Sequence, residues 1–147
     1  MLLSKTCDYA IRAALYIAVN EDRQFVPIRE ISEQLNISFH FLTKILQILT
    51  QKDIMASFKG PKGGIALARP AGKISVKEIV LAVDGPQIFE NCLLGLEKCG
   101  EENPCPLHEQ WAAIRSQLNQ LFEHTTLAEM AEKVKSNKFR MANVQVP

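Results

Sequence analysis

Most of the cysteines in this sequence lie in one short stretch. Cys92, Cys99 and Cys105 are three of its four cysteines, with six and then five residues between them, and His108 follows the last by three positions. Thiolates bind zinc and iron–sulfur clusters far more tightly than magnesium or calcium, because sulfur is a soft ligand. The stretch is therefore predicted to hold an iron–sulfur cluster, or zinc in a site of three cysteines and one histidine. Three unligated thiols are the remaining alternative.

The same residues offer little for catalysis. Cys105 and His108 have the residue types of a nucleophile and its base, but the sequence contains no oxyanion motif and no third group that would orient the histidine. We therefore expect neither enzyme activity nor a small-molecule substrate. Cys7, the fourth cysteine, is expected to be a small buried residue of a helix, as free cysteines usually are.

Length and composition favour one domain. The chain has 147 residues, of which 47% are hydrophobic, and this is enough to bury a core without disulfides. Few cysteines and no visible export signal favour a reducing cytoplasm. The apolar N-terminal stretch is interrupted by Asp8 and Arg12, and no run reaches the roughly 18 apolar residues that a membrane span needs. We expect no membrane association.

The two halves of the chain differ in charge. Residues 1–73 carry ten lysines and arginines against six acidic residues, whereas the remainder carries seven against ten. A basic half can face a polyanion, so nucleic acid is a candidate partner of the N-terminal half.

Two short helices in that half are predicted to be joined by a tight turn. Ser4 is expected to cap a first helix over residues 4–20, where apolar residues recur every three or four positions. Pro27 suits the first turn of a second helix that ends near Asn36, and Ser38 caps a third. The last two helices, joined at residues 35–38, predict a helix-turn-helix.

A β-hairpin is predicted to follow. Residues 54–58 and 65–68 have the composition of short strands, and they flank the segment Lys59-Gly-Pro-Lys-Gly-Gly64, whose glycines would supply the positive backbone angles of a hairpin tip. This hairpin would be a wing. The remaining expected elements are a helix over residues 73–82, a long helix over 106–122, a helix from a capping box at Thr126 to residue 135, and a frayed tail over 136–147.

The predicted fold is mainly α, a winged helix-turn-helix domain with a long C-terminal dimerisation helix. We expect a DNA-binding domain over residues 1–85, a cysteine-rich cluster-binding loop over 86–106, and the dimerisation helix with the C-terminal tail over 107–147. The helix over 106–122 is long for one with so little chain left to pack on, so a second copy of the chain is expected to cover it. The chain is therefore predicted to be a homodimer.

A helix-turn-helix presents the first turn of its second helix to the major groove of double-stranded DNA. Base-edge contacts are therefore expected from the residues at the start of that helix, Ser38, Phe39, His40, Thr43 and Lys44. Phosphate contacts are expected from four cations on other elements, Lys5, Arg12, Lys59 and Lys62. Lys62 lies at the hairpin tip, where a flexible cation can follow the backbone or enter a minor groove.

Three segments carry a family resemblance. They are the opening Leu3-Ser-Lys-x-x-Asp8-Tyr-Ala-Ile-Arg-Ala, the segment Ile31-Ser-x-x-x-x-Ile37-Ser with its following helix, and Lys59-Gly-Pro-Lys-Gly-Gly64 followed by Leu67-Ala-Arg-Pro. With the three clustered cysteines, the chain resembles the Rrf-type bacterial winged-helix transcription regulators, which include IscR-, NsrR- and RirA-like iron–sulfur cluster sensors. Position 59 departs from the pattern, because many relatives have arginine there. Lysine keeps the charge without the planar fork, so contacts of the wing with DNA are expected to differ.

The resemblance implies a homodimer that binds a palindromic operator and senses iron, redox state or nitric oxide. In cluster-binding members three cysteines hold the cluster, and Cys92, Cys99 and Cys105 match them in order. His108 matches the histidine that completes a 2Fe–2S site in IscR-like members. Asp8 matches an aspartate that completes a 4Fe–4S site from the other subunit in some NsrR-like members. Of these two sites, the 2Fe–2S site with His108 is favoured. Changes at the cluster are expected to shift the recognition helices relative to each other.

Overall fold

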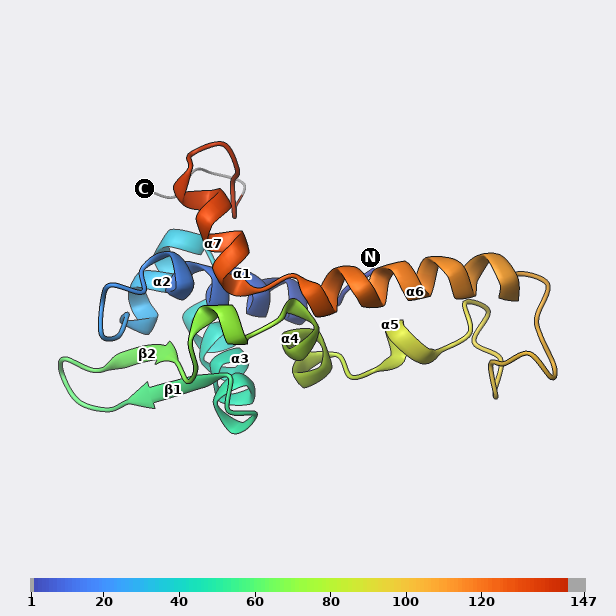
Figure 1. Ribbon diagram of the computed structural model, residues 1–147. Coiled ribbons are helices and arrows are strands. Elements are labelled where there is room, and N and C mark those ends of the chain that lie inside the picture. Colours follow the sequence, from blue (N-terminus) through green and yellow to red (C-terminus); the bar gives the residue numbers. More distant parts are fainter. Residues whose placement is uncertain (1, 143–147) are drawn as a thin grey trace.

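The computed structural model describes residues 2–142. One end of the molecule holds the helix-turn-helix and a two-stranded hairpin, and from there one long helix extends away, with the cysteine loop beyond its far end (Figure 1). The predicted winged-helix fold, mainly α, is confirmed. The elements in chain order are α1 (Lys5–Val19), α2 (Ile28–Leu35), α3 (Phe39–Gln51), β1 (Met55–Phe58), β2 (Gly64–Leu67), the 3₁₀ turn η1 (Ala71–Lys73), α4 (Val76–Val83), α5 (Gln87–Glu90), α6 (His108–His124) and α7 (Leu127–Lys135).

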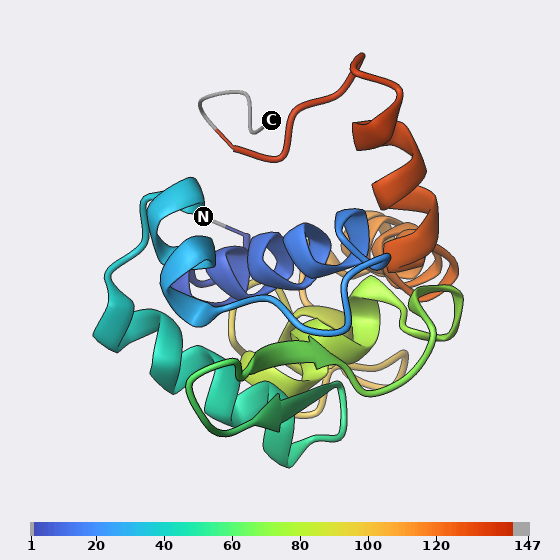
Figure 2. The same ribbon diagram turned by 90° about the vertical axis from the view of Figure 1, so that its left-hand side faces the viewer.

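Helix α1 is the centre of the winged domain. As predicted, Ser4 caps it, because its side chain accepts a hydrogen bond from the backbone N–H of Cys7. Much of its buried surface is alanine: Ala10, Ala13, Ala14 and Ala18 are all fully buried. Small side chains let neighbouring helices come close, and α1 contacts α3, α4 and α7. Figure 2 looks from the wing side, with α1 in blue at the middle of the domain.

The helix-turn-helix is built from local signals. Asn36 adopts a left-handed backbone conformation (φ 54°) that ends α2, and Ser38 caps α3. The carboxylate of Glu30 on α2 accepts hydrogen bonds from the Tyr16 hydroxyl (2.7 Å) and from both terminal nitrogens of Arg23 (2.7 and 2.9 Å). The Arg23 bonds hold the pKa of Glu30 below its usual value, and this network fixes α2 against α1.

The wing hairpin is close to the predicted one, and its register pairs Met55 with Leu67 and Phe58 with Gly64. The glycines of the hairpin were predicted to supply positive backbone angles, and this prediction is wrong for two of the three. Only Gly60 of the three has a positive φ, of 110°. A Cβ atom on Gly63 would lie 2.1 Å from the carbonyl oxygen of Phe58, and one on Gly64 would lie 2.4 Å from that of Val26. These two positions need glycine because the backbone approaches closely, not because of a positive angle.

The C-terminal half departs from prediction in two places. The short helix α5 had no signal in the sequence pattern. Residues 136–142, expected to fray, turn back onto the domain, so that Ala142 is buried with the main core; the rest of the predicted tail lies outside the described residues. Helix α7 begins after Thr126 as predicted and packs on α1. Among residues 2–142, no helix combines the length and the apolarity that crossing a bilayer requires.

Replacing Gly63 by alanine is expected to lower the free energy of unfolding by roughly 1–3 kcal/mol, because the new methyl group overlaps the Phe58 carbonyl. Urea unfolding followed by circular dichroism measures this. Gly72→Ala is the matched control, since its added Cβ would meet only Ala128, at 3.9 Å. Equal stability of the two variants would contradict the close-contact explanation.

Candidate functional site

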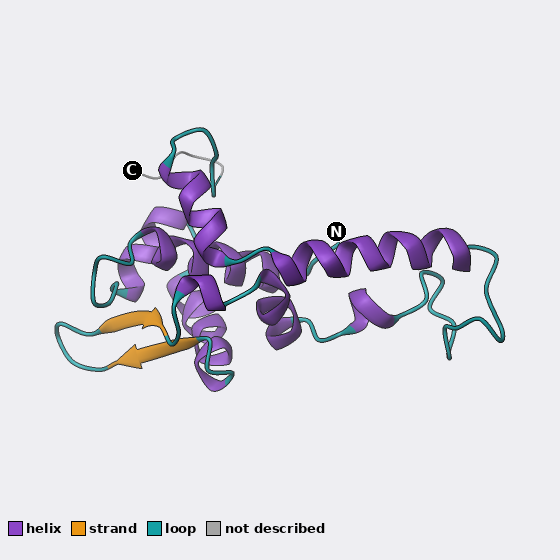
Figure 3. Ribbon diagram, in the orientation of Figure 1, coloured by secondary structure: helices purple, strands orange, loops and turns teal. Residues whose placement is uncertain are grey.

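The cysteine loop joins α5 to α6 and lies at the opposite end of the molecule from the β-hairpin (Figure 3). Cys92 stands just after α5 and is buried, whereas Cys99 and Cys105 are half-buried. All four cysteines of the chain are free. The helix that follows begins at His108, so this histidine projects from the first turn of α6 beside the loop.

The predicted ligands form two close pairs. The sulfur atoms of Cys92 and Cys105 are 3.6 Å apart, and the sulfur of Cys99 is 3.6 Å from Nδ1 of His108. Within the described part of the chain, no three His, Cys, Asp or Glu side chains form a single metal-binding group. The loop therefore gathers three sulfur atoms and one imidazole, in two pairs.

Backbone N–H groups favour a thiolate at Cys92. The N–H of Leu96, with smaller contributions from those of Leu94 and Gly95, points to the Cys92 sulfur and lowers its pKa. Gly95 permits this tight turn, because its φ is 75°. Burial raises the pKa of the Cys105 thiol. Hydrogen bonds from N–H to sulfur are common around metal-bound thiolates, and soft donors suit iron–sulfur clusters and zinc alike, so the residues present fit either group.

Asp8 and Cys7 lie on α1. The Asp8 carboxylate forms an ion pair with Arg12 one turn later, with 2.8 Å between Oδ1 and Nε. Cys7 is fully buried, as expected, and burial raises the pKa of its thiol to about 12. The structure thus brings His108 to a cysteine within one protomer, and it pairs Asp8 with Arg12 instead.

The predicted base-reading residues stand at the start of α3. Ser38, Phe39, His40 and Lys44 are exposed, while Thr43 is half-buried and donates its hydroxyl hydrogen to the Phe39 carbonyl oxygen at 2.8 Å. Phe39 is 37% exposed. It presents an apolar surface among polar neighbours.

The four cations predicted to contact phosphate differ in their exposure. Lys59 and Lys62 on the wing and Lys5 on α1 are exposed, whereas Arg12 is half-buried and already paired with Asp8. Sequence reasoning missed Arg29 of α2, whose guanidinium lies 5.0 Å from the centre of the Phe39 ring. The first helix of a helix-turn-helix crosses the DNA backbone, and an exposed arginine in its first turn was the available signal.

Sequence reasoning also missed two side chains of α6 that reach the cysteine loop. The indole N–H of Trp111 donates to the Asn91 carbonyl oxygen at 2.8 Å, and Nη1 of Arg115 lies 3.3 Å from the Cys99 sulfur. Their spacing of four residues puts both on one face of a helix, but nothing in the sequence shows that the loop folds back onto that face.

Comparison with known proteins gives consistent matches. Residues 3–133 match the profile of the Rrf2 family, described as iron-dependent transcriptional regulators. The chain is 36% identical over 132 residues to an HTH-type transcriptional regulator of Aquifex aeolicus, covering 88% of this chain and 91% of that protein. It is 32% identical over 130 residues to the HTH-type transcriptional regulator IscR of Cronobacter sakazakii, covering 88% and 80%. The structure of CymR, the global cysteine regulator of B. subtilis, superposes with a TM-score of 0.78 at 23% identity, covering 89% and 96%.

The rate of alkylation is expected to distinguish the three loop cysteines from Cys7. Treatment of the chelator-treated native protein with iodoacetamide is expected to modify Cys92, Cys99 and Cys105 and to spare Cys7. A pKa of about 12 in place of 9.0 makes the Cys7 thiolate fraction about a thousandfold smaller, and the side chain is fully buried. Mass spectrometry of peptides gives each rate, and unfolding in urea is the control that should release Cys7. A Cys7 rate equal to that of the loop cysteines would contradict its burial.

Proposed function

Since the chain belongs to the Rrf2 family of transcriptional regulators, we propose that it binds operator DNA as a homodimer with an affinity set by an iron–sulfur cluster at Cys92, Cys99 and Cys105. The observation that carries this proposal is the pairing in the cysteine loop, where each of the three sulfurs lies 3.6 Å from another sulfur or from the His108 imidazole. The iron dependence in the description of the family adds support.

His108 is the proposed fourth ligand. Its Nδ1 is already within 3.6 Å of the Cys99 sulfur, and imidazole can replace a thiolate on one iron of a 2Fe–2S centre. Asp8 is the alternative, in a 4Fe–4S site. It would have to come from the partner subunit and exchange its ion pair with Arg12 for the metal. The closeness of His108 to Cys99 within one chain supports His108 over Asp8, and with it the 2Fe–2S centre.

The exposed surface of α6 supports the homodimer. All 17 residues of this helix remain at least partly exposed in one protomer. Two of its large apolar side chains, Ile114 and Leu121, are 51% and 58% exposed. A second copy of α6 would remove this apolar surface from water. Two recognition helices related by a two-fold axis would then read a palindromic operator.

The position of the loop suggests how a change in its bound group would alter the affinity for DNA. A bound cluster supplies iron that can be oxidised, nitrosylated or lost. Holding it would require Cys92, Cys99 and Cys105 to converge on one group, which would order the loop between α5 and α6. Without that constraint the loop relaxes, and α6 loses a fixed starting point. Helix α6 rests on α4, which packs on α1 and α3, so a movement of α6 would reach the recognition helix.

One observation favours a second candidate. The two sulfurs of Cys92 and Cys105 lie close enough that small movements would bring them within bonding distance. The same loop would then act as a redox-thiol site, or hold zinc through its three thiolates and His108, without any iron–sulfur cluster.

Purification without oxygen tests the cluster. The protein is expected to be brown and to contain iron and acid-labile sulfide in equal amounts. Cys92→Ala, Cys99→Ala and Cys105→Ala should each lose most of the iron, because each removes one thiolate ligand. Cys7→Ala is the matched control and should keep it. A colourless wild-type protein that carries zinc would reject the cluster in favour of the second candidate.

The exposed ring of Phe39 makes a specific prediction about DNA. The thymine methyl is the apolar group in the major groove, so Phe39 is expected to contact one. Operators selected from a random pool are remade with deoxyuridine for thymine at single positions. At one position in each half-site the affinity should fall about fourfold, the value of one buried methyl group. Phe39→Ala should bind both DNAs equally. If Phe39→Ala still lost affinity when deoxyuridine replaced thymine, the contact between Phe39 and the thymine methyl would be excluded.

Lys62 of the wing is expected to contribute to DNA binding through a phosphate contact and not through a base. Lys62→Gln is expected to weaken binding to all sequences alike and to reduce the slope of log K against log salt by about 1, because it removes one phosphate contact. Fluorescence anisotropy across a salt series measures this slope. Lys138→Gln, which removes an exposed lysine near the C-terminus, is the control and should leave the slope unchanged.

A further inference from the structure

Two side chains of α6 hold both the start and the middle of the cysteine loop. Nη1 of Arg115 donates to the carbonyl oxygens of Glu90 (2.9 Å) and Asn91 (3.1 Å) and lies 3.3 Å from the Cys99 sulfur. One turn earlier, Trp111 donates its indole N–H to the same Asn91 carbonyl. Asn91 immediately precedes Cys92, so one guanidinium connects the backbone next to the first cysteine with the sulfur of the second.

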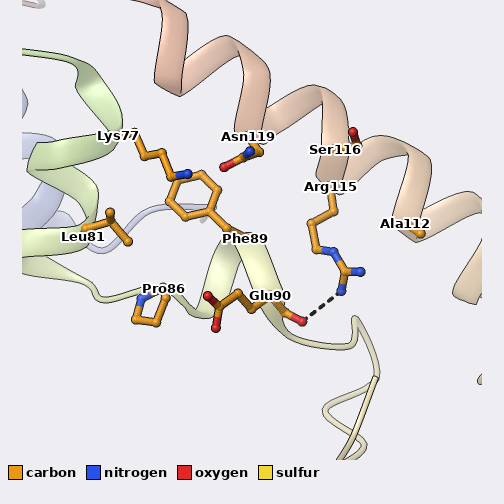
Figure 4. Close-up of a pocket in the computed structure, with 9 residues that line it drawn as sticks. All are labelled: Lys77, Leu81, Pro86, Phe89, Glu90, Ala112, Arg115, Ser116 and Asn119. Carbon is orange, nitrogen blue, oxygen red and sulfur yellow. Dashed lines mark hydrogen bonds between the residues drawn. The ribbon is translucent and has the colours of Figure 1, made fainter. Parts of the chain in front are cut away.

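The N-terminal half of α6 has few other attachments. An open pocket of about 420 Å³ lies between this part of α6 and the facing residues of α4 and α5, and Figure 4 shows Arg115 reaching across to the Glu90 carbonyl while Lys77 and Leu81 line the α4 side. Apolar contact with α5 is made further along, where the rings of Phe89 and Phe122 meet edge to face at 5.9 Å. Among the described residues, the side-chain hydrogen bonds of this half of α6 all go to Glu90, Asn91 or Cys99, and the pocket leaves open space beside it.

We propose that Arg115 is a positioning residue that links the bonding state of the Cys99 sulfur to the position of α6. The strength of a hydrogen bond from a guanidinium to sulfur depends on what else that sulfur bonds, so a ligated or oxidised sulfur is a different acceptor from a free one. The same nitrogen also bonds the Glu90 and Asn91 carbonyls. A change at the sulfur therefore redistributes the bonds that hold α6 to the loop.

This inference deepens the proposed function, because it names the contact through which the cysteine site would act on the dimerisation helix. It does not depend on which metal the site holds. The coupling must be reciprocal, so the Arg115 contact also influences how Cys99 is presented to a ligand.

The chain has a single tryptophan, Trp111, and its indole N–H bonds the same Asn91 carbonyl as Arg115, so its fluorescence reports on this part of the loop. The test is a double-mutant cycle on metal-free protein, read by acrylamide quenching of Trp111. Cys99→Ala is expected to raise the quenching constant at least about twofold, because the loop no longer holds α6. Arg115→Met keeps the aliphatic stem without donors and should give a similar rise. Adding Cys99→Ala to Arg115→Met should then change nothing further.

Ser116→Ala is the matched control, since Ser116 lines the same pocket and is exposed. It should leave the quenching constant at the wild-type value. Additive effects of Cys99→Ala and Arg115→Met, or no effect of Cys99→Ala on Trp111, would overturn the proposal. If Arg115→Met does not fold by circular dichroism, Arg115→Lys replaces it, with partial retention of the coupling expected.

A second measurement uses Zn²⁺ alone, which absorbs no visible light and does not quench by energy transfer. Zinc should shift Trp111 emission in the wild type, while Arg115→Met should take up the same number of zinc ions at saturation, with a changed affinity and without the shift. If zinc shifted Trp111 emission in Arg115→Met as far as in the wild type, the proposed role of Arg115 would be overturned. Absence of zinc binding to the wild type would count against the proposed metal centre only, since the metal-free cycle still decides the role of Arg115.

Discussion

The close packing of other helices on α1 is the interaction on which the rest of the structure depends. Its fully buried alanines, such as Ala10 and Ala14, place only methyl groups on the α1 side of these contacts. The recognition helix α3, the connecting helix α4 and the returning helix α7 all contact α1. Protein interiors are close-packed and transmit displacement, so a shift of α4 relative to α1 is felt at α3. An event at the far end of α6 therefore has a physical route to the DNA-reading surface.

Under the proposed function, the cysteine loop and the DNA-reading surface at the start of α3 have opposite physical requirements. The DNA-reading surface must be rigid before DNA arrives, and the caps of α2 and α3 and the bonds from Tyr16 and Arg23 to Glu30 provide this. The loop must change with its ligand, and its residues lie in turns with few apolar contacts: Leu93, Leu94 and Leu96 are all more than half exposed. Segments of low local stability are those that respond to ligands. Placing the two at opposite ends of the molecule lets each meet its own requirement.

The sequence allowed the fold to be predicted well because its signals are local. Ser4, Ser38, Ser75 and Thr126 each accept a hydrogen bond from a backbone N–H three residues later, so the start of each helix depends on a few neighbouring residues. The ion pair of Asp8 with Arg12 is equally local, at a spacing of four residues, and could have been read in the same way. Gly63 was assigned correctly to the wing for the wrong reason, because its close neighbour is the Phe58 carbonyl across the turn.

The sequence by itself thus determined every helix except α5, the helix caps, the wing and the set of soft donors in the loop, since each depends on residue type and on short spacing. Only the tertiary structure decided which of those donors meet, with Cys92 beside Cys105 and Cys99 beside His108. It alone brought Arg115 to Cys99, sixteen residues away, and to the carbonyl of Glu90, twenty-five residues away. Such contacts depend on how an irregular loop folds back onto a helix. An irregular loop has no periodic pattern, so its path is set by packing and hydrogen bonds between residues far apart in the chain.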